Sequence, residues 1–566
     1  MAFFAALCAI NAKYIHSSLA PWCLAAGVEA YAPELTVRVV EGTINEPPEA
    51  VLERICDGAP KAVTFSCYLW NITETLTLAA RLKQRLPGAV VALGGPEVSY
   101  NAADVLRENP QIDYILSGEG EQSVPAFLRC LAAGTDPLTA NIPGLCGREG
   151  QTVVESAPCV LPGDVPSPYT PAYLSALGGR IAYLETSRGC PYSCAFCLSG
   201  RCGKPRWFGL DRAFRDILTL ANSGAKTVKF IDRTFNANPR HANAILAFIL
   251  EHYGRDIPAG VCFHFEIAGD ILKEETFRLL ERMPVGAVQL EIGMQSFCER
   301  TLEAVRRKTD TKVLKENIRR LVEMGNMHIH IDLIAGLPFE DLSTFAKSFD
   351  EGYALGASML QLGFLKLLHG AAMREETQVY PCEFSKTPPY EVQSTPWLSE
   401  EDLALLHKTE DALERVYNSR RFRRTAAYVL EASGMRPFDF YTALGKAAGD
   451  TARMDLDGYT SLVYAFCQTL PGVDPVLLRD AMVCDRLSTN ATGRLPACLH
   501  IKDPLLAKAV RSLAQNPATA PKPGVRRGVA LLYGARQVVF VDYTQKNPVT
   551  ASYVLHRVPI DNLSDR

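Results

Sequence analysis

Three cysteines within eight residues constrain this chain more than any other feature. They stand in the segment Cys190-Pro-Tyr-Ser-Cys194-Ala-Phe-Cys197, directly after an apolar, strand-like run at residues 181–186. Three thiolates with this spacing can wrap one face of a metal centre. A structural zinc site would need a further ligand pair, and the chain has no second C-x-x-C. The spacing favours a [4Fe–4S] cluster with one open iron; zinc, a chance grouping and Cys202 as a fourth ligand are the alternatives.

The rest of the composition is that of an ordinary globular protein. The chain has 566 residues, 48% apolar and 21% charged, and 59 basic against 62 acidic side chains give a formal net charge of −3. This balance excludes wholesale disorder and a strong field toward nucleic acid or membrane. Because the 17 cysteines are scattered and no apolar run approaches a membrane span, we expect a cytoplasmic protein without a disulfide framework.

Alternating strand and helix patterns predict an α/β fold in several parts. Residues 1–137 carry five short strand patterns between helical ones, which predicts a doubly wound, Rossmann-like parallel sheet. Six prolines in residues 138–178 predict a linker without regular elements. Residues 179–375 show six further strand patterns, which predict an open, partial (β/α)6 barrel of the TIM type. Residues 376–566 are expected to form a mostly helical C-terminal domain with a hairpin at residues 528–543.

The strand patterns can be placed along the chain. The predicted strands are residues 3–10, 36–40, 62–66, 90–94 and 114–116 in the first part, and residues 181–186, 227–231, 261–267, 287–292, 328–334 and 359–365 in the barrel. The cysteine segment then follows the carboxyl end of the first barrel strand, the side on which αβ barrels build their active sites.

The cysteine segment resembles the C-x₃-C-x-Φ-C signature of the radical SAM superfamily. Phe196 takes the aromatic place before the third cysteine and is expected beside the cofactor. Four later segments agree in order and spacing: Phe230-Ile-Asp-Arg-Thr-Phe, His264-Phe-Glu-Ile, Leu290-Glu-Ile-Gly-Met-Gln-Ser and Asp332-Leu-Ile-Ala-Gly-Leu-Pro. The resemblance implies a [4Fe–4S] cluster on Cys190, Cys194 and Cys197, with S-adenosylmethionine bound at its open iron. It further implies reductive cleavage to a 5′-deoxyadenosyl radical and an electron donor such as flavodoxin or ferredoxin.

The same resemblance suggests contacts to S-adenosylmethionine at the strand ends. Asp232 stands where the methionine ammonium is usually held, with a helix N-cap as the alternative. Glu266 and Glu291 interrupt apolar strand ends, where carboxylates are rare without a partner, and are expected to accept hydrogen bonds from ribose or a substrate amine. Gln295 and Ser296 offer neutral partners for the same sugar.

Residues 1–135 resemble the cobalamin-binding (B12-binding) domains that precede many radical SAM barrels. The matching segments, each after a predicted strand, are Phe65-Ser-Cys-Tyr-Leu-Trp, Gly94-Gly-Pro-Glu and Gly118-Glu-Gly-Glu. A doubly wound sheet binds its ligand at the carboxyl ends of its strands. The residues expected to contact cobalamin are therefore Ser66, Gly94, Gly95, Gly118 and Glu119, the glycines by letting backbone lie against the ligand.

One departure bears on the lower face of cobalt. Domains that ligate cobalt from the protein use Asp-x-His-x-x-Gly after the first strand, whereas this chain reads Tyr14-Ile-His-Ser-Ser-Leu19. Without the aspartate nothing fixes the tautomer of His16, so we expect cobalamin bound with no protein ligand to cobalt. The alternatives are a hydrogen-bonding role for His16 and a domain that has lost cobalamin.

Together these features predict a cobalamin-dependent radical SAM enzyme that methylates an unactivated carbon. The alternatives are a radical SAM enzyme whose N-terminal domain is a substrate platform without cobalamin, and a non-catalytic iron–sulfur or cobalamin carrier. The substrate (a small molecule, a peptide or RNA) and the oligomeric state stay open, and no membrane partner is expected. The one charged cluster of the C-terminal part, Arg420-Arg-Phe-Arg-Arg424, is either a grip for an anionic substrate or RNA, or a solvated helix face.

Overall fold

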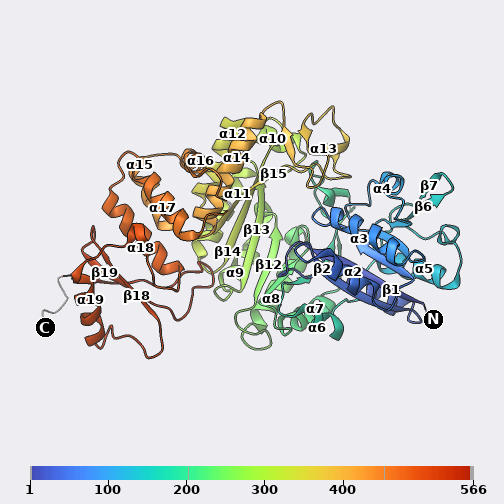
Figure 1. Ribbon diagram of the computed structural model, residues 1–566, viewed down its shortest axis with the longest axis horizontal. Coiled ribbons are helices and arrows are strands. Elements are labelled where there is room, and N and C mark those ends of the chain that lie inside the picture. Colours follow the sequence, from blue (N-terminus) through green and yellow to red (C-terminus); the bar gives the residue numbers. More distant parts are fainter. Residues whose placement is uncertain (1–2, 202, 452, 561–566) are drawn as a thin grey trace. The chain divides into compact units, whose positions relative to one another are not determined.

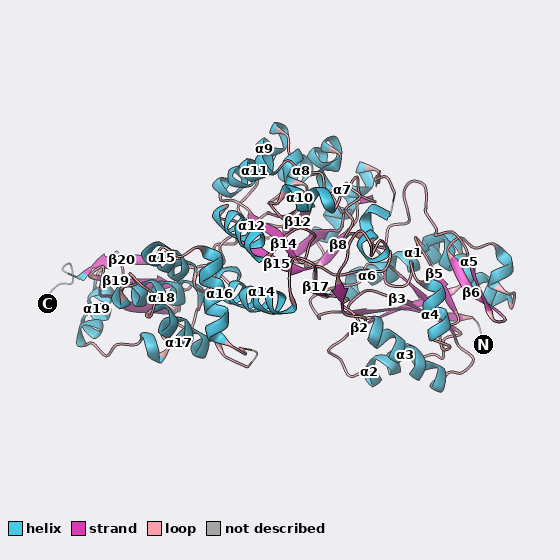
Figure 2. Ribbon diagram, turned by 90° about the horizontal axis from the view of Figure 1, so that it is seen from above, coloured by secondary structure: helices cyan, strands magenta, loops and turns pink. Residues whose placement is uncertain are grey.

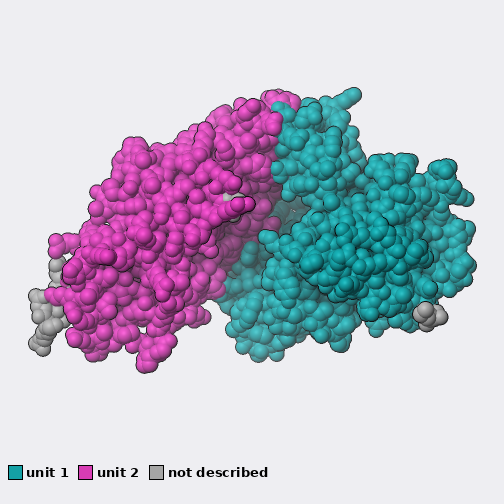
Figure 3. Space-filling view, in the orientation of Figure 1, with its two compact units in different colours: residues 1–289, 303–309, 365–395 teal, residues 290–302, 310–364, 396–566 magenta. Residues whose placement is uncertain are grey.

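The computed structural model of the protein describes residues 3–201, 203–451 and 453–560. They group into two compact units, coloured separately in Figure 3. Unit 1 comprises Met1–Gln289, Glu303–Thr309 and Leu365–Thr395, and unit 2 comprises Leu290–Leu302, Asp310–Phe364 and Pro396–Arg566. Among the described residues no helix combines the length and the apolar character needed to cross a membrane.

The N-terminal part of unit 1 is a seven-stranded sheet in the order β2-β1-β3-β4-β5-β6-β7. Its first five strands run parallel. They are β1 Phe4–Asn11, β2 Thr36–Thr43, β3 Ala62–Ser66, β4 Val90–Gly94 and β5 Tyr114–Leu116. The order 2-1-3-4-5 is that of flavodoxin-like sheets, whose ligand crevice lies at the carboxyl ends of the strands. The predicted doubly wound sheet is confirmed.

Helices cover both faces of this sheet (Figure 2). They are α1 Ala20–Tyr31, α2 Pro48–Cys56, α3 Ile72–Arg85, α4 Ala102–Glu108 and α5 Gly120–Ala133. Successive side chains of a strand point to opposite faces, and β1 is apolar at every position of its centre. Ala6 and Cys8 accordingly belong to the core formed with α2 and α3. Ala5 and Leu7 belong to the core formed with α1 and α5.

The proline-rich stretch, predicted to be a linker without regular elements, contains three of them. The strands β6 Leu145–Glu149 and β7 Thr152–Glu155 add an antiparallel hairpin to the sheet, and α6 spans Pro171–Leu177. The prolines permit this because none lies inside the hairpin strands, while Pro171 takes the first turn of α6, where its missing N–H is not needed. The number of prolines alone therefore does not exclude regular elements, because their positions decide whether a strand or helix can form.

The six barrel strands predicted from the sequence are all present and form an open sheet in the order β15-β14-β13-β12-β11-β8 (Figure 1). They are β8 Ala182–Leu184, β11 Thr227–Phe230, β12 Cys262–Ile267, β13 Val288–Gln295, β14 His328–Ala335 and β15 Met359–Phe364. The helices along this part are α7 Leu210–Ala221, α8 Pro239–His252, α9 Glu274–Glu281, α10 Glu299–Ala304, α11 Thr311–Met324 and α12 Leu342–Ala354.

The rest of unit 2 is mostly helical, as predicted. Helix α14 (Glu400–Leu413) starts with a capping box between Ser399 and Asp402 and runs on into a π-helical turn, η5 Glu414–Asn418. The following helices are α15 Arg423–Ser433, α16 Pro437–Ala448, α17 Leu456–Cys467, α18 Pro475–Thr489 and α19 Pro504–Gln515. The predicted hairpin exists as β18 Arg527–Leu532 and β19 Gln537–Asp542, and a third strand, β20 His556–Pro559, joins it. Its charged, proline-ended sequence gave no strand pattern.

Helices α1 and α5 pack against each other at Gly27, where a Cβ would lie 2.2 Å from the carbonyl oxygen of Glu121. We expect Gly27→Ala to lower the free energy of unfolding of this domain by about 1–3 kcal/mol, because the two helix backbones must separate. The midpoint of urea unfolding, followed by hydrogen exchange of the β1 and β3 amides, measures the effect. Gly88→Ala is the control, since no atom lies within 4 Å of a Cβ there; equal midpoints for both variants would contradict this account.

Candidate functional site

The cysteine loop follows β8 and the short strand β9 (Ser187–Arg188) in unit 1. Its middle is anchored by the Ala195 amide, which donates to Val305 O at 2.9 Å, and by the Met373 amide, which donates to Ala195 O at 3.0 Å. A hydrogen-bonding group lies beside each sulfur: Thr234 Oγ1 3.5 Å from Cys190 Sγ, the Ser199 amide 3.4 Å from Cys197 Sγ, and Arg307 Nη1 4.0 Å from Cys194 Sγ. Cys202 lies outside the described residues.

The three thiols are close enough to influence one another, but they are spread more widely than the ligands of one ion. Burial raises the pKa of Cys194, Arg307 opposes this, and Cys197 and Cys190 add to it. A zinc ion about 2.3 Å from each sulfur would draw the sulfurs to about 4 Å from one another. Among the described residues the only group of three ligand atoms within 4.8 Å of one another is elsewhere, at Glu291, His330 and Asp332. The spacing of the thiols suits a larger centre than a single ion.

Asp232, expected to hold the methionine ammonium, is engaged inside the protein instead. Its side chain is 1% exposed. Its Oδ2 accepts the Thr186 amide at 3.0 Å, and its Oδ1 accepts the hydroxyls of Thr186 at 2.7 Å and Ser187 at 2.5 Å. Burial raises the pKa of Asp232 to about 6, although these three hydrogen bonds favour the charged form. Asp232 therefore fixes the chain that leads into the cysteine loop, which is neither the predicted contact nor an N-cap.

Arg188, two residues before Cys190, is shared by three carboxylates. Its guanidinium donates to Glu185 at 2.9 Å, to Glu119 at 3.0 Å and to Glu121 at 2.5 Å, and Arg206 also pairs with Glu119. Arg188 is 15% exposed and Glu121 3%. Burial works against the charge of Arg188, but Glu185 and Glu121 outweigh it and raise its pKa. This ion-pair network joins α5 and the loop before it to the strand that enters the cysteine loop.

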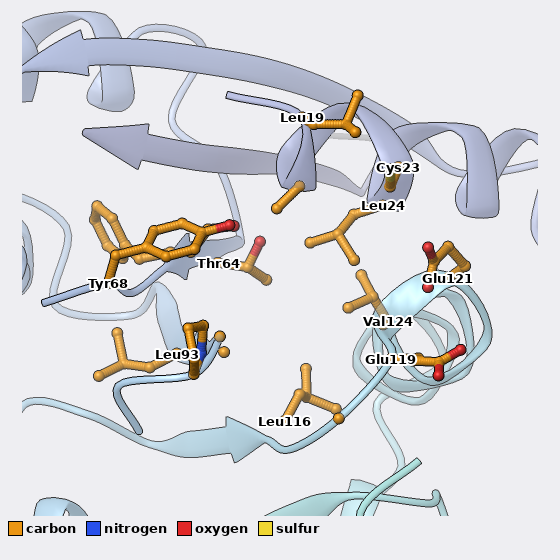
Figure 4. A pocket seen from close by; sticks show the side chains of 18 of the residues that line it. Leu19, Cys23, Leu24, Thr64, Tyr68, Leu93, Leu116, Glu119, Glu121 and Val124 are labelled. Carbon is orange, nitrogen blue, oxygen red and sulfur yellow. The ribbon is translucent and has the colours of Figure 1, made fainter. Parts of the chain in front are cut away.

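A cavity of about 280 Å³ lies next to this network, at the carboxyl ends of β3, β4 and β5. Figure 4 shows Leu24, Val124 and Leu116 around it, with Glu119 and Glu121 at one side. All five residues predicted to contact cobalamin line it: Ser66, Gly94, Gly95, Gly118 and Glu119. Glu185, Arg188 and Ile231 complete the lining from the ends of β8, β9 and β11. The cavity is thus bounded by both α/β parts of unit 1.

Two of the glycines at the cavity also contact neighbouring loops of the protein. A Cβ on Gly95 would lie 2.5 Å from Cys67 O, and one on Gly118 would lie 2.3 Å from Cys159 O, both backbone atoms of neighbouring loops. Their φ angles of +98° and +90° also exclude most other residues. These glycines let loops of the protein pack against one another.

His16 does not line the cavity. Its Nδ1 lies 2.6 Å from the hydroxyl of Tyr183 in β8, and burial lowers its pKa. This arrangement agrees with the hydrogen-bonding role that was the alternative to a metal ligand.

The remaining predicted residues of unit 1 are accessible to a ligand in different degrees. Glu266, at the end of β12, pairs with Lys229 Nζ at 3.3 Å and is half-buried. Phe196 is half-buried within the cysteine loop.

In unit 2, Gln295 ends β13 in an unusual state. Its φ is +72°, in the left-handed region, and its side-chain Oε1 is buried without a hydrogen-bond partner among the described residues. Strained backbone and an unsatisfied buried acceptor at a strand end are typical of ligand sites. The contact of Gln295 with S-adenosylmethionine stays a prediction, and these two features support it.

Ser296 and Glu291 are engaged within unit 2. Ser296 is fully buried and donates to Glu340 Oε1 at 2.7 Å, so the predicted ribose contact from its hydroxyl is corrected. Glu291 lies beside His330, whose Nε2 is 2.9 Å from Asp332 Oδ1. Burial disfavours a charged His330, but Asp332 and Glu291 outweigh it and raise its pKa. Glu291 thus lies beside a histidine whose charged form it favours.

Sequence reasoning missed Arg188, Glu121 and Glu185. Glu121 is the last residue of the recognised segment Gly118-Glu-Gly-Glu, and Glu185 and Arg188 shortly precede the cysteine segment. Buried charges require partners, so opposite charges at two strand ends of adjoining parts were the available signal.

Comparison with known proteins matches three parts of the chain to family models. They are a B12 binding domain over residues 6–128, the Radical SAM superfamily over residues 184–351, and a protein of unknown function (DUF4080) over residues 378–523. The first two cover the doubly wound sheet and the part that carries the cysteine loop.

Individual relatives give the same picture. The 2-(S-pantetheinyl)-carbapenam-3-carboxylate methyltransferase of Streptantibioticus cattleyicolor is 28% identical over 364 residues, 60% of this chain and 51% of that protein. The cobalamin-dependent radical SAM methyltransferase TokK of Streptomyces tokunonensis is 28% identical over 337 residues, 56% of this chain and 47% of that protein. The chain spans about half the length of these relatives.

A solved structure shares the fold. The radical S-adenosylmethionine methyltransferase TsrM from Kitasatospora setae, with cobalamin and a [4Fe-4S] cluster bound, matches with a TM-score of 0.56 and 19% identity over 69% of this chain and 76% of that chain. With its cysteine loop at the end of β8 and a doubly wound sheet before it, the chain carries a radical SAM domain over residues 184–351 and, before it, a B12-binding domain over residues 6–128.

Proposed function

We propose that the chain is a cobalamin-dependent radical SAM enzyme that methylates an unactivated carbon. The observation that carries the proposal is the set of ion pairs made by Arg188, which lies two residues before Cys190. Arg188 pairs with Glu119 and Glu121 of the B12-binding domain and with Glu185 of the radical SAM domain. The same side chains line the cavity at the end of the doubly wound sheet. A ligand in this cavity and a cluster on the cysteine loop would therefore be neighbours. Two methyltransferases among the relatives support methylation as the outcome.

The cysteine loop fits a [4Fe–4S] cluster. Cys190, Cys194 and Cys197 would hold it, and the Ser199 amide and the Arg307 guanidinium would stabilise the thiolates of Cys197 and Cys194. Gln295, with its unsatisfied Oε1, and Glu266 are the side chains we assign to S-adenosylmethionine. Asp232 acts indirectly, by fixing the start of the loop.

The cavity in unit 1 fits one edge of cobalamin. At about 280 Å³ it is slightly below the usual range for a whole small-molecule ligand, so it would receive only part of the group. Its lining is apolar at Leu24, Leu116 and Val124 and carries the hydroxyl of Ser66. No histidine is among the described residues that line it, so we propose that cobalamin binds without a protein ligand to cobalt.

When bound, the cluster and S-adenosylmethionine supply the radical that removes hydrogen from carbon, and cobalamin supplies the methyl group. The chain's own part is to bind and orient these groups and to exclude water. Arg188 and its carboxylates hold the two ligand-binding loops at a fixed separation, and Leu24, Leu116 and Val124 offer water no hydrogen-bond partner on their part of the wall.

The proposal includes a reductant and a location. A flavodoxin or ferredoxin would supply the electron, and the substrate is a small molecule, a peptide or RNA. The cysteines of the described residues are all free thiols, as expected of a protein in the reducing cytoplasm.

Replacing Cys190, Cys194 and Cys197 together by Ala should abolish the cluster and the cleavage of S-adenosylmethionine, because no other described cysteines share a loop. Iron and sulfide per chain after anaerobic reconstitution, and the yield of 5′-deoxyadenosine, measure the two effects. Cys130→Ala, in α5, is the matched control and Cys202→Ala should keep the cluster. Four irons per chain in the triple variant would refute the assignment.

Arg188→Met should weaken cobalamin binding and lower the free energy of unfolding by about 3–5 kcal/mol, because it leaves the buried Glu121 and the partly buried Glu185 without their cation, while Glu119 keeps its pair with Arg206. Urea midpoints and cobalt retained after gel filtration provide the measurements. Arg201→Met is the control: its pair with Glu375 is about half exposed and should contribute at most about 1 kcal/mol. Equal losses of stability and of bound cobalt in the two variants would show that burial of the Arg188 network does not account for the effect.

Electron paramagnetic resonance of the Co(II) form should show no superhyperfine splitting from an axial nitrogen, because His16 is bonded to Tyr183 and does not line the cavity. His16→Ala should leave the spectrum unchanged. A nitrogen splitting that disappears in His16→Ala would make His16 a cobalt ligand. Failure to take up cobalamin by a chain with a full cluster would favour the radical SAM enzyme without cobalamin.

A further inference from the structure

A second cavity, of about 480 Å³, lies within unit 2 at the amino ends of β14 and β15. This volume is in the range of small-molecule sites. The residues that line it at the strands are Met327, Ile329 and Ser358, all near the first residue of β14 or β15. Radical SAM chemistry is placed at the opposite, carboxyl ends of these strands, so this cavity is separate from the proposed active site.

The wall of the cavity is basic. Arg420, Arg423 and Arg424, from the turn after η5 and the first residues of α15, line it together. Arg424 is neutralised by Asp485, which lies 3.3 Å away. Arg423 donates to the carbonyl of Tyr417 at 3.1 Å and to that of Ser358, and it stacks on the ring of Tyr417 at 3.5 Å. Carbonyl oxygens satisfy its N–H groups without offsetting its charge.

Arg420 carries the second uncompensated charge. It is partly buried, and within the described part of the chain no carboxylate pairs with its side chain. Burial and the nearby charge of Arg423 both lower its pKa. Two like charges held together in a partly buried cavity are unfavourable unless an anion joins them.

The backbone of Arg420 is strained. Its φ of +66° lies in the left-handed region. The turn is pinned by Asn418, whose side chain accepts the Leu360 amide at 3.0 Å and donates to Leu360 O at 2.8 Å, and by Tyr417, whose hydroxyl donates to Ala357 O at 2.6 Å. A strained residue kept by such over-determination, beside a π-helical turn, points to a functional position.

Hydroxyl groups also line the same space. Those of Ser488 and Thr489 already donate to Asp485 O, at 3.2 Å and 2.7 Å, whereas Thr550 and Ser552 share one hydrogen bond at 2.7 Å, which leaves one O–H of the pair to donate elsewhere. The Ser358 hydroxyl accepts the Ile329 amide at 3.3 Å, which leaves its O–H to donate as well. Two positive charges with two hydroxyl donors match a doubly charged anion with several oxygen acceptors better than a single carboxylate.

We propose that this cavity binds the phosphate or diphosphate group of a small molecule. The guanidinium groups of Arg420 and Arg423 hold the anion, the hydroxyls satisfy its remaining oxygens, and the aliphatic side chains of Val322, Met327 and Val549 contact the rest of the ligand. The volume of the cavity, about 480 Å³, is that of a small-molecule site, whereas a nucleic-acid strand needs a basic groove that follows several nucleotides.

The test is binding of inorganic phosphate and pyrophosphate to the full-length, cluster-loaded protein, by calorimetry at constant ionic strength. Pyrophosphate should bind the native protein and raise its unfolding temperature, since a ligand of the folded state stabilises it. Arg420→Gln should weaken binding at least tenfold, because one of two charges is lost, and Arg420→Lys should restore part of it. Arg421→Gln is the matched control: Arg421 is exposed and does not line the cavity, so binding should be unchanged.

Three outcomes would overturn the proposal. In the first, Arg420→Gln binds pyrophosphate as tightly as the native protein does. In the second, the native protein binds succinate as tightly as it binds pyrophosphate. In the third, an RNA oligonucleotide displaces pyrophosphate at a lower concentration than any small phosphate does. Circular dichroism of Arg420→Gln excludes misfolding as the cause of lost binding. The Cys190/Cys194/Cys197 triple variant should bind pyrophosphate normally, so failure of the proposed radical chemistry and failure of this site are distinguishable.

Discussion

Three carboxylates cannot be buried within a few ångströms of one another unless a cation is shared among them. In unit 1 that cation is Arg188, and its partners Glu119, Glu121 and Glu185 come from both α/β parts. The planar fork of guanidinium donors can serve several carboxylate oxygens at once, which the single ammonium of lysine cannot do with the same geometry. The position of the doubly wound sheet against the cysteine loop depends on this arrangement, because separating the two would leave charges of both signs buried without partners.

The loops at the carboxyl edge of the doubly wound sheet are also packed closely against one another. Gly118 lies against the backbone of Cys159, and Gly95 against that of Cys67, so the loops at the carboxyl edge of the sheet support one another. On the other side of the cavity, Asp232 holds Thr186 and Ser187 at the start of the cysteine loop. Loops of this kind are usually the mobile part of an α/β fold. Here both walls of the cavity are fixed by buried hydrogen bonds and ion pairs, which is the preorganisation that positioning of reactive groups requires.

The sequence predicts the positions of the strands better than the roles of polar side chains, and the reason is physical. Strands such as β3 and β14 were placed correctly because periodic burial of apolar side chains is written locally in the chain. The roles of polar side chains were not predicted correctly, because the role of a carboxylate depends on partners that are distant in the sequence. Asp232 and Ser296 were assigned to a ligand and turned out to be satisfied by Thr186, Ser187 and Glu340. Gln295 kept its assignment for a reason the sequence does not contain, namely a left-handed backbone and an acceptor without a partner.

The same limit applies to charge, and it separates two arginines that look alike in the sequence. The chain as a whole is almost neutral, with a net charge of −3, which favoured a solvated face for the cluster at residues 420–424. Net charge, however, is a sum over sites that compensate one another unequally. Arg188 is surrounded by three carboxylates, whereas Arg420 is partly buried with another arginine as its charged neighbour. A nearly neutral chain can therefore hold a locally uncompensated positive cavity, and only the three-dimensional distribution of charge identifies it.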